Sequence, residues 1–577
     1  MEELRSLFTS RRWRLRSPST GSERFAQRLG CSPVLARVLE SRGDGRSEAL
    51  IRPGRDAINP PWAFAGMEEA VARLLQALDR GEKAFIHGDF DVDGITSAVL
   101  LYLGLKRVGF VGLKVELEDR ERGHGLNREV VERLIKEGFK TLITTDCGIS
   151  DPDYVAELEA GGVNVILTDH HQPLPQLPPA TAIINPRLEE CNYPNKALAG
   201  VGVAFQLLRG LYERLGIGDE AEGFLDLVML GTVADLVPLV ADGQAENKVL
   251  VAQGLRLLAE GGGQLGLRTL IAKLGLGPAK LTAGQVGYII APKLNAANRV
   301  GDPRAAFLLL TTESPERAEY LAEILIDYNR DRQIAQDDLL YQAEELIREG
   351  AADPQRDKII ILEGDYWSPG IIGLVASDLV ERYYRPAILI SRGEWKSRAS
   401  GRSIPEFDLI AGLERFNHLF LRYGGHQMAA GFSIDNRNIP PLKEGLYEYT
   451  NEKLAGLDGP ISRIDTPLEP EEIDLGLYEE IQQLAPFGMG NPAPRFLLPR
   501  ARLSTIGVVG SGRDHLKCRA EVEGQEFECI GFGLGRYAPR LWDIEEVGLI
   551  FKLSRDEWLG QVKVQLELED FVQAREL

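Results

Sequence analysis

The stretch KAFIHGDFDVDGITS, residues 83 to 97, joins an apolar run to a cluster of charged side chains. Its first residues, KAFI, are typical of a buried strand. Three aspartates then alternate, so an extended backbone would direct their carboxylates to one face, beside an imidazole. These side chains are His87, Asp89, Asp91 and Asp93. Carboxylates crowded in this way repel one another unless cations neutralise them, and oxygen and imidazole ligands suit Mn²⁺ or Mg²⁺.

A calcium-binding loop is the alternative interpretation, because DFDVDG resembles the start of an EF-hand loop. That loop needs a bidentate Glu at its twelfth position, and counting twelve from Asp89 reaches Leu100. Gly94 instead permits a tight turn into a helix that we expect to begin near Thr96. We therefore predict a metal site where a strand meets a helix.

The surrounding region, from about residue 60 to 310, alternates apolar strands with amphipathic helices. Its strands include LKVELED, TLITTD and NVILTD, and each ends in acidic residues or a turn. The alternation predicts an α/β fold with a mostly parallel sheet covered by helices. Ligands bind such sheets at the carboxyl ends of the strands, which is where the polar groups gather here.

Three further segments add polar side chains at the ends of apolar runs. Asp146 ends TLITTD, and Asp169, His170 and His171 end NVILTD. A lone histidine is more often a structural hydrogen-bonding group, but two adjacent histidines after an aspartate favour metal or phosphate binding. Asp235 lies at the end of the helix-like run LGTVAD, where a simple helix cap is the alternative.

The remaining regions have distinct patterns. Residues 315 to 348 have the helical spacing of a long connecting helix, DKIIILEGD begins a second α/β pattern, and alternating strands such as VKVQLELEDF predict a C-terminal β-barrel. The expected regions are an N-terminal extension (1–60), the first α/β domain (61–312), the connecting helix (313–350), the second α/β domain (351–458) and the barrel (459–577).

Composition narrows the class of protein. A chain of 577 residues is too long for one core. It has no run of about eighteen uncharged apolar residues, and its charged first residues lack the apolar centre of a secretory signal, so we expect a cytoplasmic protein without membrane association. Five scattered cysteines without a CxxC pair predict buried free thiols and neither a disulfide framework nor a structural zinc site. The net charge of −20 is unusual for a nucleic-acid-binding protein, unless positive charge gathers in one groove.

Together, these segments resemble the DHH phosphoesterase superfamily, which is named after the Asp-His-His seen here at residues 169 to 171. Within it, the chain resembles the RecJ exonucleases from about residue 25 to the end. The segments that carry this resemblance are RLGCSPVLARVLESRG, NAANRVGDP, YGGHQMAAGF and LAPFGMGNPAPRF. The resemblance implies that the first domain is a DHH domain, the second is its usual companion with a GGH motif, and the barrel is of the OB type.

The resemblance also implies two divalent metal ions, Mn²⁺ or Mg²⁺, as cofactors. The implied ligands are His87 and Asp91 on one ion, Asp93, His170 and Asp235 on the other, and Asp146 as a bridge. His171 would face the scissile phosphate or support the ligands, and Asp89 would tune the site. We therefore expect Asp89, Asp146 and His171 to be catalytic. Paired ions activate a water and stabilise both oxygens of an in-line displacement.

A clamp on the phosphates of the strand is predicted mainly in the second domain. Small residues let backbone N–H groups approach a phosphate, and an arginine offers a planar donor fork. The expected substrate-binding residues are Arg299, Ser400, Arg402, Ser403, Gly424, Gly425 and His426. For any single glycine a tight turn is the alternative, and for Arg299 the alternative is a surface ion pair.

The chain departs from the RecJ pattern at Asn298, Ser368 and Asp378, where glycine, histidine and arginine respectively are more usual. An arginine near the family's GYG turn corresponds to either Arg120 or Arg122. In the barrel, candidate stacking platforms and backbone contacts are Phe487, Phe496, Trp558, Arg513, His515 and Lys517. Packing in the barrel core is the alternative for each aromatic residue.

The resemblance implies a 5′-to-3′ exonuclease that degrades single-stranded DNA to 5′-mononucleotides in DNA repair and recombination. Its implied partners are single-stranded DNA, a single-strand-binding protein and a helicase of the recombination pathway. One alternative is a DHH phosphodiesterase that acts on short RNA or dinucleotides. Another is a catalytically dead replication scaffold, which predicts missing ligands, whereas this sequence retains them.

Overall fold

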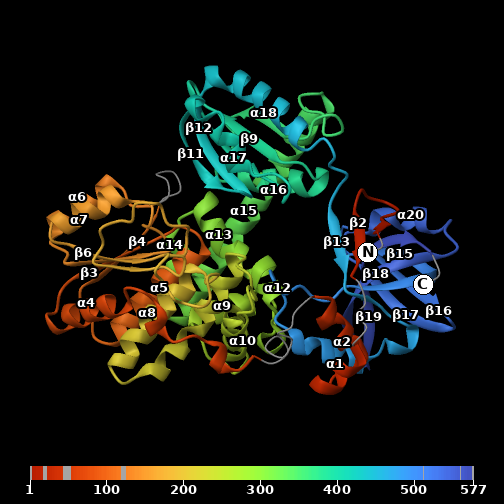
Figure 1. Ribbon diagram of the computed structural model, residues 1–577, viewed down its shortest axis with the longest axis horizontal. Coiled ribbons are helices and arrows are strands. Elements are labelled where there is room, and N and C mark those ends of the chain that lie inside the picture. Colours follow the sequence, from red (N-terminus) through yellow and green to blue (C-terminus); the bar gives the residue numbers. More distant parts are fainter. Residues whose placement is uncertain are drawn as a thin grey trace.

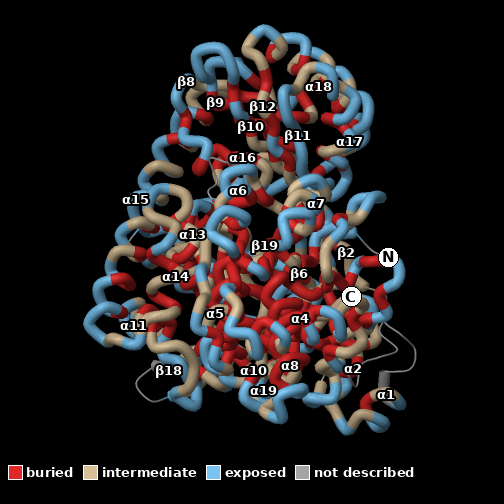
Figure 2. The backbone as a smooth tube through the Cα atoms, turned by 90° about the vertical axis from the view of Figure 1, so that its left-hand side faces the viewer, coloured by how far each residue is buried: buried red, intermediate tan, exposed pale blue. Residues whose placement is uncertain are grey.

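The computed structural model describes residues 3–16, 22–42, 53–118, 125–510, 512–558 and 561–574. Figure 1 shows a first α/β domain at the left, a second α/β domain at the top and a barrel at the right. Figure 2 shows that buried residues fill the interior of the fold, whereas helices such as α11 (Leu265–Lys273) and α15 (Pro315–Arg348) have one buried and one exposed face. Among the described residues, no helix is both long enough and apolar enough to cross a bilayer.

The first domain is built on a five-stranded parallel sheet with the order β4-β3-β5-β6-β7. All four expected apolar runs are strands of this sheet, and β3 and β5 are buried at every position, as expected for a parallel sheet with both faces covered. The strands are β3 (Ala84–Gly88), β4 (Leu113–Leu117), β5 (Thr141–Thr145), β6 (Asn164–Thr168) and β7 (Ala182–Ile184).

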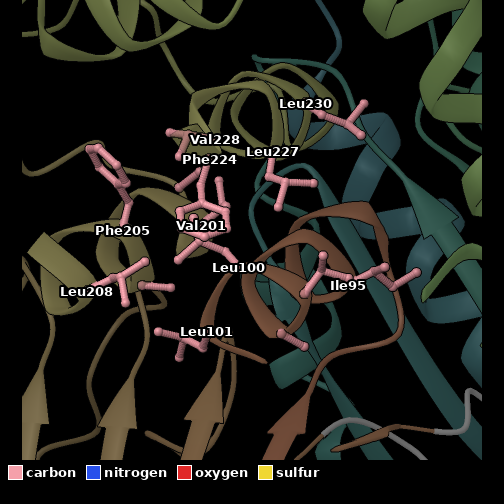
Figure 3. Packing of buried hydrophobic residues seen from close by; sticks show 14 of the residues in the cluster. Ile95, Leu100, Leu101, Val201, Phe205, Leu208, Phe224, Leu227, Val228 and Leu230 are labelled. Atoms are coloured by element: carbon pink, nitrogen blue, oxygen red, sulfur yellow. The ribbon is translucent and has the colours of Figure 1, made fainter. Parts of the chain in front are cut away.

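Helices cover both faces of this sheet. Alternate residues such as Ile86 and Ile143 pack with helices on one face, and Phe85 and Leu142 pack on the other. The first face is covered by α4 (Met67–Asp79), α5 (Val92–Arg107) and α8 (Gly200–Arg214), and the second by α6 (Arg128–Glu137) and α7 (Pro152–Ala160). Figure 3 shows the contact of α5 and α8 with α9 (Leu225–Ala234), where Ile95, Val201 and Leu227 pack together.

The remaining helices of the domain connect it to the rest of the chain. They are α10 (Glu246–Ala259), α11, α12 (Ala283–Gln285), α13 (Ala291–Val300) and α14 (Arg304–Thr311). The predicted connecting helix is α15, which begins after Ser314, whose side chain accepts a hydrogen bond from the Arg317 amide. It packs against α11, α13 and α14 of the first domain and against α16 (Ile372–Tyr383) of the second.

The second domain contains a mixed five-stranded sheet with the order β11-β12-β10-β9-β8. Its strands are β8 (Ile360–Asp365), β9 (Ala387–Arg392), β10 (Lys396–Arg402), β11 (Phe420–His426) and β12 (Ala429–Asp435). Besides α16, its helices are α17 (Leu409–Glu414) and α18 (Ile439–Lys453).

The C-terminal strands form the predicted barrel. They follow the order β15-β16-β17-β19-β18, and pairing of β15 with β18 closes the sheet. The strands are β15 (Phe496–Val509), β16 (His515–Val522), β17 (Gln525–Gly531), β18 (Val547–Trp558) and β19 (Gln561–Gln573). Phe496 is fully buried in the barrel core, so its side chain is not a stacking platform.

The predicted N-terminal extension does not stand apart. Strands β1 (Glu3–Arg5) and β2 (Arg12–Leu15) form a sheet with β13 (Ile461–Ile464) beside the barrel. Trp13 is fully buried there, and its indole N–H donates to Asp570 Oδ2 at 2.7 Å. The two ends of the chain therefore pack together, as Figure 1 shows.

The barrel domain also contacts the first domain close to a predicted metal ligand. The amide of Leu239, four residues after Asp235, donates to the Met489 carbonyl at 2.8 Å. The next residue in that loop, Gly490, has a φ of +72°, and a Cβ there would collide with the Val240 carbonyl. Only glycine fits this contact without displacing the backbone.

Candidate metal centre

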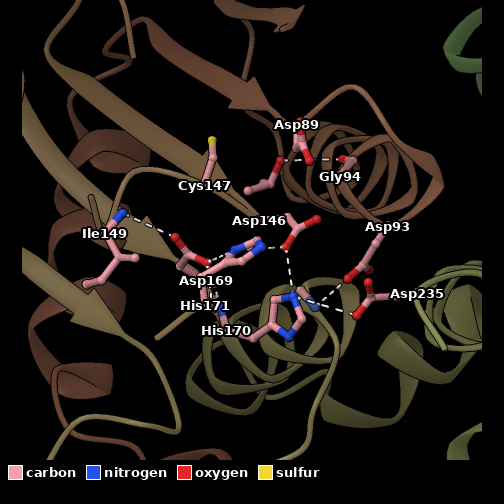
Figure 4. A network of polar contacts seen from close by, with 12 residues as sticks. Asp89, Asp93, Gly94, Asp146, Cys147, Ile149, Asp169, His170, His171 and Asp235 are labelled. Atoms are coloured by element: carbon pink, nitrogen blue, oxygen red, sulfur yellow. Dashed lines mark hydrogen bonds and ion pairs between the residues drawn. The ribbon is translucent and has the colours of Figure 1, made fainter. Parts of the chain in front are cut away.

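The aspartates of DFDVDG lie where β3 meets α5. The helix begins at Val92, earlier than the predicted Thr96, because Asp91 caps it. The Asp91 carboxylate accepts hydrogen bonds from the amides of Asp93 and Gly94 at 2.9 and 3.1 Å. Asp93 therefore lies in the first helical turn, not on an extended strand end. Asp89 and Asp93 still lie at the carboxyl edge of the sheet (Figure 4), and Asp91 shares a ligand group with Asp89 and Asp146 there.

The start of α8 fixes the position of Asp93. Amides of Gly200 and Val201 donate to its two carboxylate oxygens at 2.6 and 2.8 Å, and the positive end of the helix dipole favours the negative charge. A side chain at Gly200 would lie 2.7 Å from the Cβ of Asp146. Glycine at this position therefore lets the helix terminus approach two predicted ligands at once.

Two groups of side chains meet at this edge, a third overlaps both, and the ligand atoms within each lie within 4.8 Å of one another. Asp93, His170 and Asp235 form the first group, Asp89, Asp91 and Asp146 form the second, and Asp146, His170 and His171 form the overlapping third. Asp146 connects them, because its Oδ1 lies 3.1 Å from His170 Nε2. His170 Nε2 lies 3.6 Å from Asp235 Oδ2, and Figure 4 shows Asp146 between the two groups.

His87 is placed differently from its predicted role. Its ring shares a buried group with Glu118 and Cys147, and it belongs to neither of the two groups that meet at Asp146. Asp89 occupies the place beside Asp91 that the sequence analysis gave to His87. The alternation of charged residues in the sequence does not reveal which way a side chain turns where a strand ends.

Burial and mutual repulsion act together on these carboxylates. Burial, followed by neighbouring aspartates, raises the pKa of Asp91 to about 6 and that of Asp93 to about 7. The same causes raise the pKa of Asp146 and Asp235 well above the usual range. Burial, followed by the charge of His171, lowers the pKa of His170 to about 3, so its imidazole is neutral, the form that ligates metals.

The residues fit a pair of divalent cations. Asp146 Oδ1 is buried and accepts no hydrogen bond of normal geometry from the described residues, although His170 Nε2 lies 3.1 Å away. Bound cations would offset the cost of burying this carboxylate and the repulsion between neighbouring carboxylates. Oxygen ligands with one or two imidazoles suit Mn²⁺ and Mg²⁺.

Asp169 orients the adjacent histidines, a role that the sequence analysis did not assign. Its Oδ1 accepts hydrogen bonds from the amides of His170 and His171 at 2.7 and 2.9 Å and lies 2.8 Å from His171 Nδ1. Its Oδ2 accepts from the Ile149 amide at 3.1 Å. Burial alone would raise the pKa of Asp169, but the contacts with His171 outweigh it and lower the pKa to about 2.

In the second domain, Ser400 and Arg402 lie together on β10. Arg402 Nη1 donates to Ser400 Oγ at 3.2 Å, and a Cβ on Gly373 of α16 would lie 2.8 Å from that oxygen. Ser403 is different, because its buried hydroxyl donates to the Phe407 carbonyl at 2.7 Å and closes a turn.

The GGH motif ends β11 and faces the first domain. Burial lowers the pKa of His426, and the charges of Arg402 and His171 lower it further, so His426 lies within electrostatic reach of both domains. Gly425 has a φ of +143°, and a Cβ there would collide with the Ala429 carbonyl, whereas Gly424 has open space around its Cα. Gly425 is thus required by the turn itself.

Arg299 and Asn298 hold the domains and the aspartate loop in place. Arg299 Nη1 donates to the Gly370 carbonyl of the second domain at 2.8 Å, a contact that neither prediction for this residue included. Asn298 Nδ2 donates to the Phe90 carbonyl at 3.0 Å, which gives this unusual residue a structural role beside Asp89 and Asp91.

The other two departures from the family pattern lie at α16, and, among the residues that the structure describes, only that at Asp378 makes a side-chain contact that an alternative residue would lose. Asp378 accepts a hydrogen bond from Gln336 Nε2 at 2.6 Å and so joins α16 to α15. The Ser368 carbonyl accepts from the amides of Ile371 and Ile372 at the start of α16. Arg120 and Arg122 lie outside the described residues.

The barrel exposes only some of the predicted nucleic-acid contacts. Arg513 and Lys517 are exposed, His515 is half-buried, and Phe487 packs partly against the barrel core. The side chain of Trp558 lies outside the described part of the chain. Phe532, which the motifs did not indicate, is exposed and packs edge to face against His515, with 5.3 Å between the two ring centroids.

Comparisons with known proteins connect this site to a family. Three family models match: the N-terminal domain of the DHH family over residues 83–232, the DHHA1 domain over 356–452 and the RecJ OB domain over 464–570. The single-stranded-DNA-specific exonuclease RecJ of Salmonella typhimurium is 34% identical over 563 residues, which cover 93% of this chain and 95% of that protein. The chain belongs to the RecJ family.

Other RecJ proteins agree with this assignment. RecJ of Bacillus subtilis is 33% identical over 572 residues, which cover 98% of this chain and 71% of that protein. The crystal structure of Thermus thermophilus RecJ in complex with Mn²⁺ matches with a TM-score of 0.83 at 29% identity, covering 98% of this chain and 80% of that one. The α/β fold with its C-terminal OB barrel is therefore the RecJ fold.

Replacing Asp169 by asparagine tests its orienting role in this RecJ chain. An asparagine amide would face N–H donors, so we expect about 1.5–3 kcal/mol of lost stability and a lower midpoint of thermal unfolding at pH 7. Because the folded pKa of Asp169 is depressed to about 2, this stabilisation is present above the unfolded pKa and is lost as the pH falls from about 4 towards 2.

Thermal unfolding followed by circular dichroism from pH 7 to pH 2 measures this effect. Asp153→Asn, a change at an exposed aspartate of α7, is the control and should leave the midpoint unchanged. Equal midpoints for Asp169→Asn and the wild type at pH 7, or a difference that widens as the pH falls, would contradict the assignment.

Proposed function

We propose that this chain is an exonuclease that hydrolyses the phosphodiester bonds of single-stranded DNA with two divalent metal ions, Mn²⁺ or Mg²⁺. The observation that carries the proposal is the meeting of two ligand groups, each with two buried residues, at Asp146. Further support comes from relatives of the RecJ family named as single-stranded-DNA-specific exonucleases, and from Thermus RecJ structures in complex with Mn²⁺ and with Mg²⁺.

We assign the ligands by their two groups. Asp93, His170 and Asp235 would hold one ion, Asp89 and Asp91 the other, and Asp146 would bridge the pair. When bound, the ions supply an activated water and stabilise the charge on the attacking and leaving oxygens. The amides of Gly200 and Val201 donate to the Asp93 carboxylate and so would hold it in one orientation, towards its ion.

His171 is the residue that we assign to the scissile phosphate. Its side chain is 45% exposed, whereas that of His170 is 9% exposed, so His171 lies on the open side of the site. The contact of Asp169 with Nδ1 fixes the ring orientation and favours a proton on that nitrogen. This arrangement directs Nε2 towards the substrate phosphate.

Ser400, Arg402 and the GGH motif would bind the terminal phosphate of the strand. They lie on the side of the second domain that faces His171, as the electrostatic influence of His171 on His426 indicates. A group that holds the 5′ phosphate at a fixed distance from the cleaved bond makes the enzyme release 5′-mononucleotides one at a time. We therefore propose 5′-to-3′ polarity.

We also propose a role in DNA repair and recombination in the cytosol. A single-strand-binding protein and a helicase would generate or present the substrate. The support for this role is membership of the RecJ family.

Replacing Asp146 by asparagine should lower the rate at which end-labelled single-stranded DNA is degraded under Mn²⁺ by at least about a thousandfold, because both ions lose their shared ligand. The matched control is Asp226→Asn. Asp226 is also a buried aspartate whose pKa burial raises, to about 6, but its carboxylate accepts a hydrogen bond from the Gln264 amide away from the site. Gel analysis of single-stranded and duplex DNA measures both variants. Full activity of Asp146→Asn would contradict the proposed bridge, and turnover of dinucleotides in preference to long strands would favour a DHH phosphodiesterase.

Replacing Arg402 by alanine should remove the preference for a 5′-phosphorylated end. The loss of a charged hydrogen-bond donor predicts a fall of roughly tenfold to a hundredfold in kcat/KM for phosphorylated strands and little change for strands ending in a 5′ hydroxyl. Steady-state kinetics with both substrates measures the effect. Arg437→Ala, a change at an exposed arginine that pairs with Asp435, is the control. An equal loss on both substrates would contradict the terminal-phosphate assignment.

A further inference from the structure

A separate ligand group lies beside the two proposed catalytic groups, at the same edge of the parallel sheet. It consists of Glu118, His87 and Cys147, whose ligand atoms lie within 4.8 Å of one another. Glu118 follows β4, His87 is part of β3, and Cys147 comes two residues after β5, so three adjacent strands supply one residue each. All three residues are buried.

The His87 ring is buried inside this group with few hydrogen-bond partners. It is 1% exposed, and no described side chain forms a hydrogen bond with either ring nitrogen. Burial lowers the pKa of His87, and a backbone contact with Gly125 opposes this shift. Its nearest carboxylate atom is Glu118 Oε1, 3.8 Å from Nε2, which is beyond hydrogen-bonding distance. One backbone contact satisfies at most one of the two ring nitrogens, so a simple structural role leaves part of this burial unexplained.

The distances and donor atoms fit a tetrahedral cation. Two ligands of a tetrahedral zinc ion lie about 3.5 Å apart, close to the separation of His87 Nε2 and Glu118 Oε1. The Gly125 amide donates to Glu118 Oε1 at 2.7 Å and fixes the carboxylate in place. Thiolate, imidazole and carboxylate groups are each ligands of Zn²⁺ in proteins, whereas Mn²⁺ and Mg²⁺ prefer oxygen.

The group is distinct from the proposed catalytic ligands. His87 and Cys147 belong to neither of the groups that meet at Asp146. Figure 4 shows that the Cys147 sulfur points away from the side chains of Asp146 and His170. The absence of a CxxC pair excludes a typical structural zinc motif but does not exclude a site with a single thiolate.

We propose that Glu118, His87 and Cys147 bind one ion of the zinc class at a site separate from the catalytic pair. The fourth position would be taken by water, as in zinc sites with three protein ligands. The Cys147 thiol releases its proton when the sulfur–metal bond forms. This site does not depend on the nuclease proposal, because none of its three residues belongs to the ligand groups assigned there.

Cobalt(II) is the probe that tests the site, because a thiolate bound to Co²⁺ gives an intense near-ultraviolet charge-transfer absorption that oxygen ligands do not. We expect the full-length wild type to show this absorption at one equivalent of Co²⁺ per chain. Zn²⁺ should remove it by displacing the Co²⁺, and Mn²⁺ should not. Absence of the absorption, or displacement by Mn²⁺ as readily as by Zn²⁺, would overturn the proposal.

Variants identify the ligands. Cys147→Ser should lose the absorption, whereas Cys191→Ser, a change at another buried cysteine of the same domain, should keep it. Asp235→Asn, which removes a proposed catalytic ligand, should also keep it, so failure of the zinc site and failure of the nuclease proposal are distinguishable.

Glu118→Gln keeps an acceptor for the Gly125 amide and should weaken Co²⁺ binding by about tenfold or more, which provides a second test if Cys147→Ser does not fold. Absorption that survives in Cys147→Ser, or unchanged Co²⁺ affinity in Glu118→Gln, would overturn the assignment of these ligands.

Discussion

Repulsion among buried aspartates at the carboxyl edge of one parallel sheet is the constraint on which the rest of the site depends. Burial, followed by the charges of neighbouring aspartates, raises the pKa of Asp91, Asp93 and Asp146. Burying charges of the same sign is costly unless hydrogen bonds and cations offset the repulsion. The helix terminus at Gly200 supplies amides, and Asp169 fixes the adjacent histidines, but neither neutralises Asp146. The fold thus forms a carboxylate-rich site whose charge divalent cations would neutralise.

The other domains are attached close to this place. Arg299 bonds the Gly370 carbonyl of the second domain, Asn298 holds the aspartate loop, and the Met489 loop of the barrel domain contacts Leu239 shortly after Asp235. The Met489 contact therefore also supports the backbone near Asp235, as the Asn298 contact supports the backbone between Asp89 and Asp91. Part of the net charge of −20 lies in these buried aspartates, so the overall charge says little about the surface that would meet DNA.

The sequence predicted the fold well where the signal was local. The apolar runs before Asp89, Asp146 and Asp169 are adjacent parallel strands, and residues 315–348 are one helix. Contacts between distant residues were not predictable, as with Trp13 and Asp570, which are 557 positions apart. The direction of side chains was also not predictable, because nothing in HGDFDVDG reveals that His87 turns towards Glu118 and Cys147. Arg299 and Ser403 bond backbone carbonyls, contacts that a motif alone does not reveal.

Anomalous diffraction from a crystal of the protein grown with Mn²⁺ tests the central claim most directly. The account predicts two manganese peaks about 3.5–4 Å apart, one within the Asp93, His170 and Asp235 group and one beside Asp89 and Asp91, with Asp146 between them. A single peak, or two peaks too far apart to share Asp146, would contradict it.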